Sequence, residues 1–182
     1  MQITGGKYNS LHIKTPDFDN IKPTLSKTRQ GIFNSLLTMI EPENKVFFDL
    51  FSGSGIMSLE ALSRGFRVIS FEKDRKTAIA IKNCFKSLKL TPELYVGDTL
   101  KNIIKIDIKA DVIFMDPPYD SELYEQSLSL IKEKQILKED GIIIMEHPIE
   151  KIIKNDGFEL IKAKTYGNKQ ISFLKYRTNQ AE

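Results

Sequence analysis

The sequence predicts an α/β domain with a doubly wound, mostly parallel sheet, on three observations. Short apolar segments alternate along the chain with segments whose apolar residues recur at helical spacing. The apolar segments lack in-and-out alternation, as expected of strands covered by helices on both faces. Near the C-terminus two strand-like segments, 158–166 and 171–176, are separated by only four residues. This short connection predicts an antiparallel pair at the edge of the sheet.

The first forty residues predict an irregular or short β arm followed by one amphipathic helix. Thr24 or Ser26 is a suitable N-cap, because a hydroxyl can accept a hydrogen bond from a free amide at the start of a helix. The helix is expected to begin near Thr24 and to end near Glu41-Pro42, because apolar residues recur at helical spacing: Ile32, Phe33, Leu36, Leu37 and Ile40.

The remaining elements follow in regular alternation. Strands are predicted at 45–51, 68–71, 94–96, 111–115 and 142–146, and helices at 55–64, 76–88, 99–106 and 122–136. Alternating strands and helices with short connections predict right-handed crossovers and therefore a parallel sheet.

Length and composition favour one globular domain spanning 1–182. Of the 182 residues 41% are hydrophobic and 28% are charged, which excludes intrinsic disorder. The longest apolar runs have three or four residues, far below the about 20 that span a membrane. A single cysteine excludes an internal disulfide, and no Cys/His cluster suggests a metal site. Since the opening residues also lack a secretory signal, we expect a cytoplasmic protein without metal or membrane contact. We also expect a monomer.

Positive charge gathers at both ends of the chain. The net charge is +3 for residues 1–40, −4 for 41–150 and +4 for 151–182. This distribution favours contact between the termini and a polyanion. Lysines that only decorate a solvated surface would give the same pattern.

A ligand site is expected at the carboxyl ends of the strands. The first strand runs into Asp49-Leu50-Phe51-Ser52-Gly53-Ser54-Gly55, whose glycines let the backbone turn sharply and approach a ligand. The stricter dinucleotide fingerprint requires a third glycine where Ser58 stands. The carboxylate of Asp49, placed near the strand end, needs a partner such as a cationic ligand centre or a loop amide.

The next two strands also end in acidic residues. Glu72 can accept hydrogen bonds from both ribose hydroxyls of a nucleoside, and Asp98 can accept one from an adenine amino group. Each residue alone is more often a helix cap or a turn residue. At three successive strand ends, the acids together predict one nucleoside-shaped site.

The fourth strand ends in Asp116-Pro117-Pro118-Tyr119. Two prolines prevent continuation of strand or helix, so they hold a carboxylate, a carbonyl and an aromatic ring in one rigid corner. A planar substrate with an amino group fits this corner: its ring stacks on Tyr119, and its NH2 donates to Asp116 and to the Pro117 carbonyl. We predict that these four residues are catalytic.

This series of motifs resembles that of S-adenosylmethionine-dependent methyltransferases that act on exocyclic amines. The blocks ITGGKY, Lys22-Pro23-Thr24, Arg29, Phe33-Asn34 and Tyr166-Gly167 are similar to the bacterial family that methylates N2 of a guanine in 16S ribosomal RNA, the RsmD type. The resemblance covers essentially the whole chain. It implies a Rossmann-like methyltransferase fold and S-adenosyl-L-methionine as cofactor, bound by Asp49, Phe51, Gly53, Gly55, Glu72, Lys73, Asp98, Thr99 and Asp116.

The resemblance also implies a partner, 16S ribosomal RNA or the small ribosomal subunit. The candidate phosphate contacts are Lys22, Lys27 and Arg29, and segment 1–40 is expected to contribute to RNA and cofactor binding. An adenine-N6 DNA methyltransferase, or another amino-group methyltransferase, is the alternative, although 182 residues leave little chain for reading a DNA sequence. A nicotinamide-dependent oxidoreductase and a non-catalytic RNA-binding module fit the motifs less well.

Overall fold

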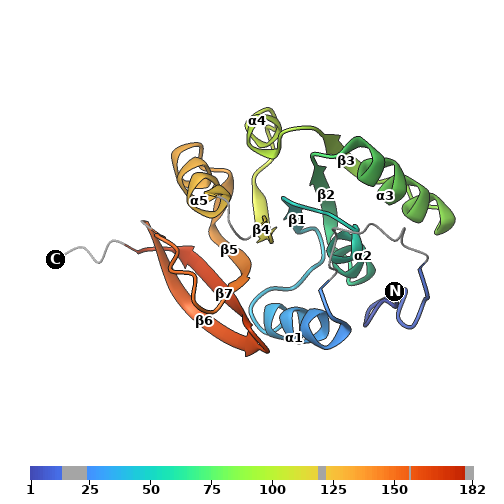
Figure 1. Ribbon diagram of the computed structural model, residues 1–182, viewed down its shortest axis with the longest axis horizontal. Helices are drawn as coiled ribbons and strands as arrows, with labels where there is room; N and C mark the ends of the chain where they lie inside the picture. The colour runs from blue at the N-terminus through green and yellow to red at the C-terminus, as the bar shows by residue number, and fades with distance from the viewer. Residues whose placement is uncertain (14–23, 119–121, 156, 179–182) are drawn as a thin grey trace.

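The computed structural model describes residues 1–13, 24–118, 122–155 and 157–178. It contains a seven-stranded sheet with the order β3-β2-β1-β4-β5-β7-β6 (Figure 1). The strands are β1 (Val46–Asp49), β2 (Arg67–Glu72), β3 (Glu93–Val96), β4 (Ala110–Met115), β5 (Leu137–Pro148), β6 (Phe158–Tyr166) and β7 (Lys169–Tyr176). Strands β1 to β5 run parallel, and β7 pairs antiparallel with both β5 and β6. The predicted doubly wound sheet with an antiparallel edge is confirmed.

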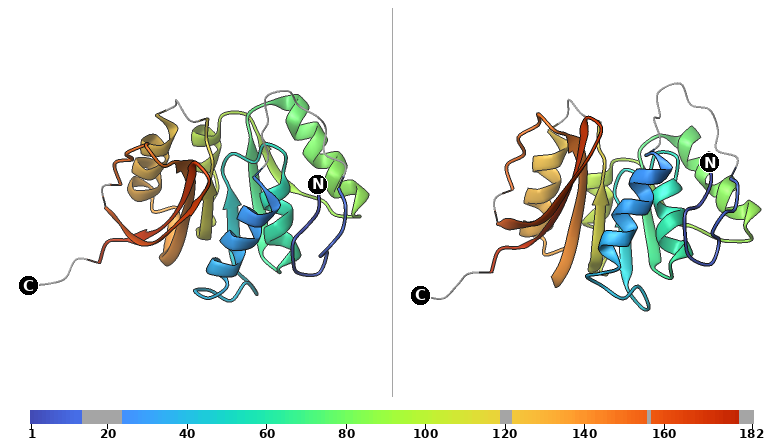
Figure 2. Two further views of the ribbon diagram at one scale, coloured as in Figure 1. Left: turned by 60° about the horizontal axis from the view of Figure 1, so that its bottom comes forward. Right: turned by 90° about the horizontal axis from the view of Figure 1, so that it is seen from below.

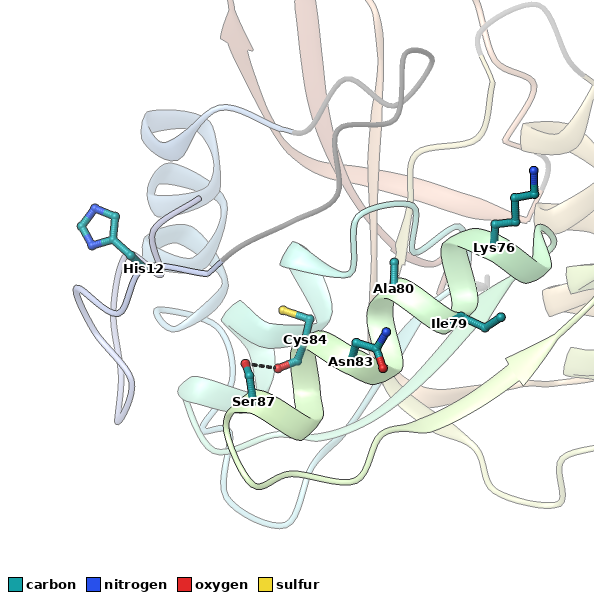
Figure 3. Close-up of a pocket in the computed structure, with 7 residues that line it drawn as sticks. All are labelled: His12, Lys76, Ile79, Ala80, Asn83, Cys84 and Ser87. Atoms are coloured by element: carbon teal, nitrogen blue, oxygen red, sulfur yellow. Dashed lines mark hydrogen bonds between the residues drawn. The ribbon is translucent and has the colours of Figure 1, made fainter.

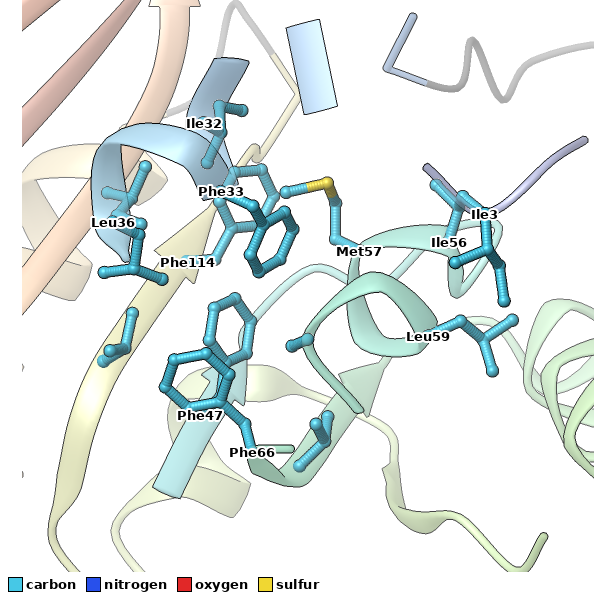
Figure 4. Close-up of a cluster of buried hydrophobic side chains, with 14 of the residues drawn as sticks. Ile3, Ile32, Phe33, Leu36, Phe47, Ile56, Met57, Leu59, Phe66 and Phe114 are labelled. Atoms are coloured by element: carbon cyan, nitrogen blue, oxygen red, sulfur yellow. The ribbon is translucent and has the colours of Figure 1, made fainter. Parts of the chain in front are cut away.

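Helices cover both faces of the sheet: α1 (Ser26–Leu36), α2 (Ile56–Ser63), α3 (Arg75–Ser87), α4 (Thr99–Ile103) and α5 (Leu123–Glu133). The first three pack on one face, and α4 and α5 pack on the other (Figure 1 and Figure 2). Because successive strand residues point to opposite faces, Phe47 joins the α1–α3 cluster (Figure 4) and Phe48 joins the other one. Within the described ranges, no helix is long and apolar enough to cross a membrane.

Helix α5 and strand β5 differ in extent from the prediction. The helix ends at Glu133 instead of residue 136, and the strand begins at Leu137 instead of residue 142. Leu137 pairs with Ala110, and the ladder is irregular before Val112 pairs with Ile142. The residues of this irregular stretch, 138–140, are polar and at least partly exposed, so they carry no apolar pattern that would predict a strand.

The N-terminal arm, residues 1–13, folds back on itself and packs against α2. Gln2 and His12 form an isolated antiparallel bridge, and Ile3 is fully buried. The Lys7 amide donates to the Ser63 carbonyl at 2.6 Å. The arm and the following helix are therefore present, but the predicted helix end near Glu41-Pro42 is wrong, because α1 ends at Leu36. The predicted cap is wrong: Leu25 is the N-cap of α1 and no side chain caps the helix, because the Thr24 hydroxyl instead donates to Glu146.

Gly6 is the position in the arm least able to carry a side chain. Its φ is +77°, and a Cβ there would lie 2.0 Å from the Ser63 carbonyl oxygen. We expect Gly6→Ala to lower the free energy of unfolding by about 3 kcal/mol, combining left-handed strain with backbone overlap. Gly167 is a matched control, because its φ is +62° but a Cβ would meet nothing within 4 Å. Gly167→Ala should cost only about 1 kcal/mol in urea unfolding. Equal decreases in the free energy of unfolding for the two variants would contradict the packing of the arm on α2.

Candidate functional site

The strand order creates a switch point between β1 and β4. From β1 the chain moves outward through β2 and β3, and it then returns to place β4 on the other side of β1. In such sheets ligands bind beyond the carboxyl ends of the strands at the switch point. Asp49 pairs with Phe114 in the register of β1 and β4. The fold therefore brings the two loops that the sequence singles out, after Asp49 and at Asp116, to the same edge.

The glycine loop is joined to the end of β2. The Gly53 amide donates to Glu72 Oε2 at 2.9 Å, and the Asp74 amide donates to Oε1 at 2.7 Å. Burial raises the pKa of Glu72, while these amide hydrogen bonds act to lower it. Gly55 is the N-cap of α2 with φ +75°, and a Cβ there would lie 3.1 Å from Ile81. The structure thus places the glycine loop, with Gly53 and Gly55, against Glu72 at the end of β2 and against Ile81 of α3.

Asp49 is fully buried and only half satisfied. Its Oδ2 accepts a hydrogen bond from the Ser58 hydroxyl at 2.6 Å, and Ser58 in turn lies 2.8 Å from Ser70 Oγ. Its Oδ1 has no hydrogen-bond partner among the described residues. Burial raises the pKa of Asp49 to about 6, because the hydrogen bond from Ser58 only partly offsets the lost hydration. A buried carboxylate oxygen without a partner fits the amino group of a cationic ligand.

Because the pKa of Asp49 is raised on folding, its negative charge opposes folding at neutral pH. Stability from the protonated form is present below about pH 4 and is lost as the pH rises through about 6. We therefore expect Asp49→Asn to raise the free energy of unfolding of the ligand-free protein by about 2 kcal/mol at pH 7.5, with little difference at pH 4. Urea unfolding across this pH range measures the effect.

Asp111 provides a control of opposite sign. Although its burial acts to raise the pKa of Asp111, hydrogen bonds from Lys138 and from the Val46 amide outweigh burial and lower it. Asp111→Asn should therefore destabilise the protein at neutral pH, with a loss that shrinks as the pH falls. Shifts of the same sign in the Asp49 and Asp111 variants would contradict our account of the Asp49 site.

Asp98 and Thr99 are engaged within the protein. Asp98 is the N-cap of α4 and accepts a hydrogen bond from the Lys101 amide at 3.0 Å. The Thr99 hydroxyl donates to the Leu50 carbonyl at 2.9 Å, which ties α4 to the end of β1. Of the other predicted cofactor residues, Phe51 is half-buried and Lys73 is exposed. Asp98 is thus a helix N-cap in this structure. Its contact with a nucleobase stays a prediction.

The proline corner follows β4 and therefore lies at the same carboxyl edge of the sheet as the glycine loop. Asp116 is half-buried, Pro117 is buried and Pro118 is exposed, whereas Tyr119 lies outside the described residues. Burial raises the pKa of Asp116 to about 7, with further increases from the charges of Glu146 and Asp49 and a decrease from Lys169.

Sequence reasoning missed Glu146 and Lys169, which are ion-paired at this edge. A signal for Glu146 was present, because it is an acid at the end of an apolar run, as Asp49 is. The alternation of strand residues places Asp49 and Glu146 on the α1–α3 side of the sheet, since Phe48 and Met145 belong to the cluster on the opposite face. Asp116 directly follows β4, and its charge interacts with those of both residues.

The prediction that Arg29 contacts RNA phosphate is wrong for this structure. Its side chain is only 2% exposed, and its Nε donates to Glu60 Oε1 at 3.0 Å. The remaining guanidinium nitrogens donate to the carbonyls of Thr24 and Gln2. A guanidinium buried in this way joins α1, α2 and the arm, so it is not available to a phosphate. Of the two predicted lysines, Lys27 is exposed on α1, and Lys22 lies outside the described residues.

A hollow lies beside α3 and His12 of the N-terminal arm. It contains no predicted site residue and is lined by His12, Lys76, Ile79, Ala80, Asn83, Cys84 and Ser87 (Figure 3). Among the described residues, no group of three or more His, Cys, Asp or Glu side chains is placed to hold a metal ion.

A glycine loop and acidic strand ends on this sheet define a Rossmann-like domain of the S-adenosylmethionine-dependent methyltransferase class. The same fold occurs in "Putative methyltransferase yhhF from Escherichia coli" (TM-score 0.83, 21% identity, 98% of this chain and 99% of that one). It also occurs in the SAH-bound Podospora anserina methyltransferase PaMTH1 (TM-score 0.67, 12% identity, 86% and 80%). The family model described as "Conserved hypothetical protein 95" matches residues 1–175, and the chain belongs to this RsmD-type family.

Two relatives carry more specific names. "Putative rRNA methyltransferase YlbH" of Bacillus subtilis is 33% identical over 187 residues, covering 97% of this chain and 100% of the relative. "Ribosomal RNA small subunit methyltransferase D" of Haemophilus influenzae is 29% identical over 174 residues, covering 92% and 89%. The resemblance inferred from the motifs is therefore confirmed at the level of the family.

Proposed function

We propose that this chain is a cytoplasmic S-adenosylmethionine-dependent methyltransferase that methylates the N2 amine of a guanine in 16S ribosomal RNA on the small ribosomal subunit. The observation that carries the proposal is the placement of Asp116, a half-buried acceptor in a proline corner, at the switch point beside the glycine loop. The names of the relatives support ribosomal RNA as the substrate.

The residues of the glycine loop fit the cofactor. S-adenosylmethionine, when bound, supplies an electrophilic methyl group. Asp49 offers the ligand's amino group a carboxylate oxygen that has no partner among the described residues. Each oxygen of Glu72 accepts one backbone amide and keeps a lone pair for a ribose hydroxyl. Phe51, Lys73, Asp98, Thr99 and Asp116 complete the proposed set of cofactor-binding residues.

The corner at Asp116 would receive the base. A guanine has to leave its stack, at a cost of a few kcal/mol. Asp116 and the Pro117 carbonyl then accept the two N–H bonds of the amine, and the proposed role of Tyr119 is to stack on the ring. An amine that gains a methyl group releases a proton, and the Asp116 carboxylate is the acceptor placed to take it.

Recognition of RNA would fall to the basic ends of the chain. Lys27 is exposed on α1, and segment 151–182 carries a net charge of +4. We propose that Lys22, Lys27 and the C-terminal lysines contact phosphates, with segment 1–40 contributing to RNA and cofactor binding.

Methyl transfer to three acceptors tests the proposal. Purified full-length protein is incubated with methyl-labelled S-adenosylmethionine and small ribosomal subunits from a strain lacking this protein, naked 16S ribosomal RNA, or duplex DNA. Mass spectrometry of the digested nucleic acid should show N2-methylguanosine in ribosomal RNA. N6-methyladenine in the DNA would instead identify the adenine-specific alternative, and no transfer to any acceptor would overturn the proposal.

A further inference from the structure

Glu146 is a fully buried carboxylate that reaches the same edge as Asp116. Met115 and Met145 are paired in the parallel register of β4 and β5. Glu146 follows Met145 within β5, and Asp116 follows Met115 directly after the end of β4, so the two residues lie at the same level of this sheet edge. Their charges interact, and the negative charge of Glu146 disfavours the charged form of Asp116. Two carboxylates in such an arrangement repel each other unless a cation or a proton reduces the charge.

The cation is Lys169, at the start of β7. Its ammonium donates to Glu146 Oε1, and β7 is held beside β5 by antiparallel pairs that include Pro148 with Lys169. The other carboxylate oxygen, Oε2, accepts a hydrogen bond from the Thr24 hydroxyl at 3.0 Å. The Glu146 backbone carbonyl accepts a third bond, from the Tyr124 hydroxyl at 2.7 Å. Glu146 is therefore fixed in place, and it fixes the ammonium beside it.

The charges that face Asp116 come from three strands. In the described part of the chain, Glu146 on β5 and Asp49 on β1 are negative, and Lys169 on β7 is positive. Neighbouring buried carboxylates tend to share a proton. A protonated Asp116 would be a worse acceptor for an amine and for the proton that the amine releases. Lys169 opposes this protonation.

We propose that Lys169 is a positioning residue whose ammonium, anchored by Glu146, opposes protonation of Asp116 and so favours the charged form that accepts a hydrogen bond and a proton from the substrate amine. The inference rests on the proposed function for its consequence in catalysis. The charge of Asp116 itself is a property of the ligand-free protein and is measured without any substrate.

The first test is a carboxyl titration. The ligand-free full chain is labelled with 13C in its aspartate side chains, and the Asp116 signal is identified by its loss in Asp116→Asn. Lys169→Met should raise the Asp116 midpoint by about one pH unit, because a nearby positive charge is removed. Glu146→Gln should lower the midpoint by a similar amount, because a negative charge is removed.

Two further variants guard against loss of folding. Lys169→Met leaves the buried charge of Glu146 without its ammonium, so this variant is paired with Lys169→Met/Glu146→Gln, in which both charges are absent. The double variant and Lys169→Arg should both titrate near the wild-type midpoint. A purely structural role predicts no opposed shifts, so shifts of the same sign, or shifts below about 0.3 pH unit, would overturn the inference.

The second test is the pH profile of methyl transfer to small ribosomal subunits. Lys169→Met should move the acidic limb of kcat to higher pH and Glu146→Gln should move it to lower pH, while KM for the subunit stays within about two-fold. Opposed midpoints in a protein that transfers no methyl group would refute the proposed function and leave the charge-setting role intact. A profile that does not follow the measured midpoints would overturn the catalytic part of the inference.

Discussion

Asp116→Asn is expected to lower kcat for methyl transfer by about 10²- to 10³-fold, while affinity for S-adenosylmethionine stays within about two-fold. An asparagine can still accept a hydrogen bond from the amine, but it cannot take the proton that the amine releases. Steady-state methyl transfer at saturating substrate measures the first quantity, and isothermal titration calorimetry measures the second. Turnover near that of the wild type would remove Asp116 from the proposed mechanism.

The pH dependence of kcat distinguishes loss of the Asp116 carboxylate from loss of folding. Because burial and the charges of Glu146 and Asp49 raise the pKa of Asp116 to about 7, the active carboxylate forms as the pH rises. Wild-type kcat should therefore increase between about pH 6 and 8, and the Asn variant should lack this limb. Asp140→Asn is the matched control, because Asp140 is exposed near the start of β5, away from the carboxyl ends of the strands. It should leave kcat and the limb unchanged.

Part of the site could be predicted from the sequence because its residues stand in recognisable local motifs. Asp116 stands before two prolines, and Asp49 stands before a glycine loop. Glu146 has no such companions: Lys169 follows 23 residues later on another strand, and Thr24 precedes it by 122 residues. Spacing along the chain contains no information about contacts of that length. Only the pairing of β5 with β7 and the course of the N-terminal segment bring these partners together.

For the fold as well, features that depend on local sequence patterns were predicted, whereas features that depend on long-range contacts were not. Alternating apolar runs predict the parallel sheet, because both faces are buried. The first part of β5 escaped prediction because its polar residues lie in an irregular ladder. Arg29 was misjudged for a related reason: a basic residue on a helix is usually solvated. Its burial follows from a carboxylate on α2, Glu60, which is 31 residues away.

Arg29→Met is expected to lower the free energy of unfolding by about 3 to 5 kcal/mol. Glu60 is fully buried, and without Arg29 its charge keeps only Arg64 and Thr4 as partners in the described structure. The carbonyls of Gln2 and Thr24 lose a donor as well. Urea unfolding measures the loss. Arg67→Met is the matched control, because Arg67 pairs with Glu93 at the surface, with side chains 49% and 45% exposed. It should cost less than about 1 kcal/mol.

A double-mutant cycle separates the ion pair from the other contacts of Arg29. In Arg29→Met/Glu60→Gln no buried carboxylate lacks its guanidinium, so the double variant should lose less than the sum of the two single variants. The salt dependence of RNA binding then decides between burial and phosphate contact. Under conditions where Arg29→Met remains folded, the slope of log affinity against log salt should equal the wild-type slope, whereas each lost phosphate contact would reduce it by about one. A reduced slope with wild-type stability would reverse our assignment of Arg29 to the interior.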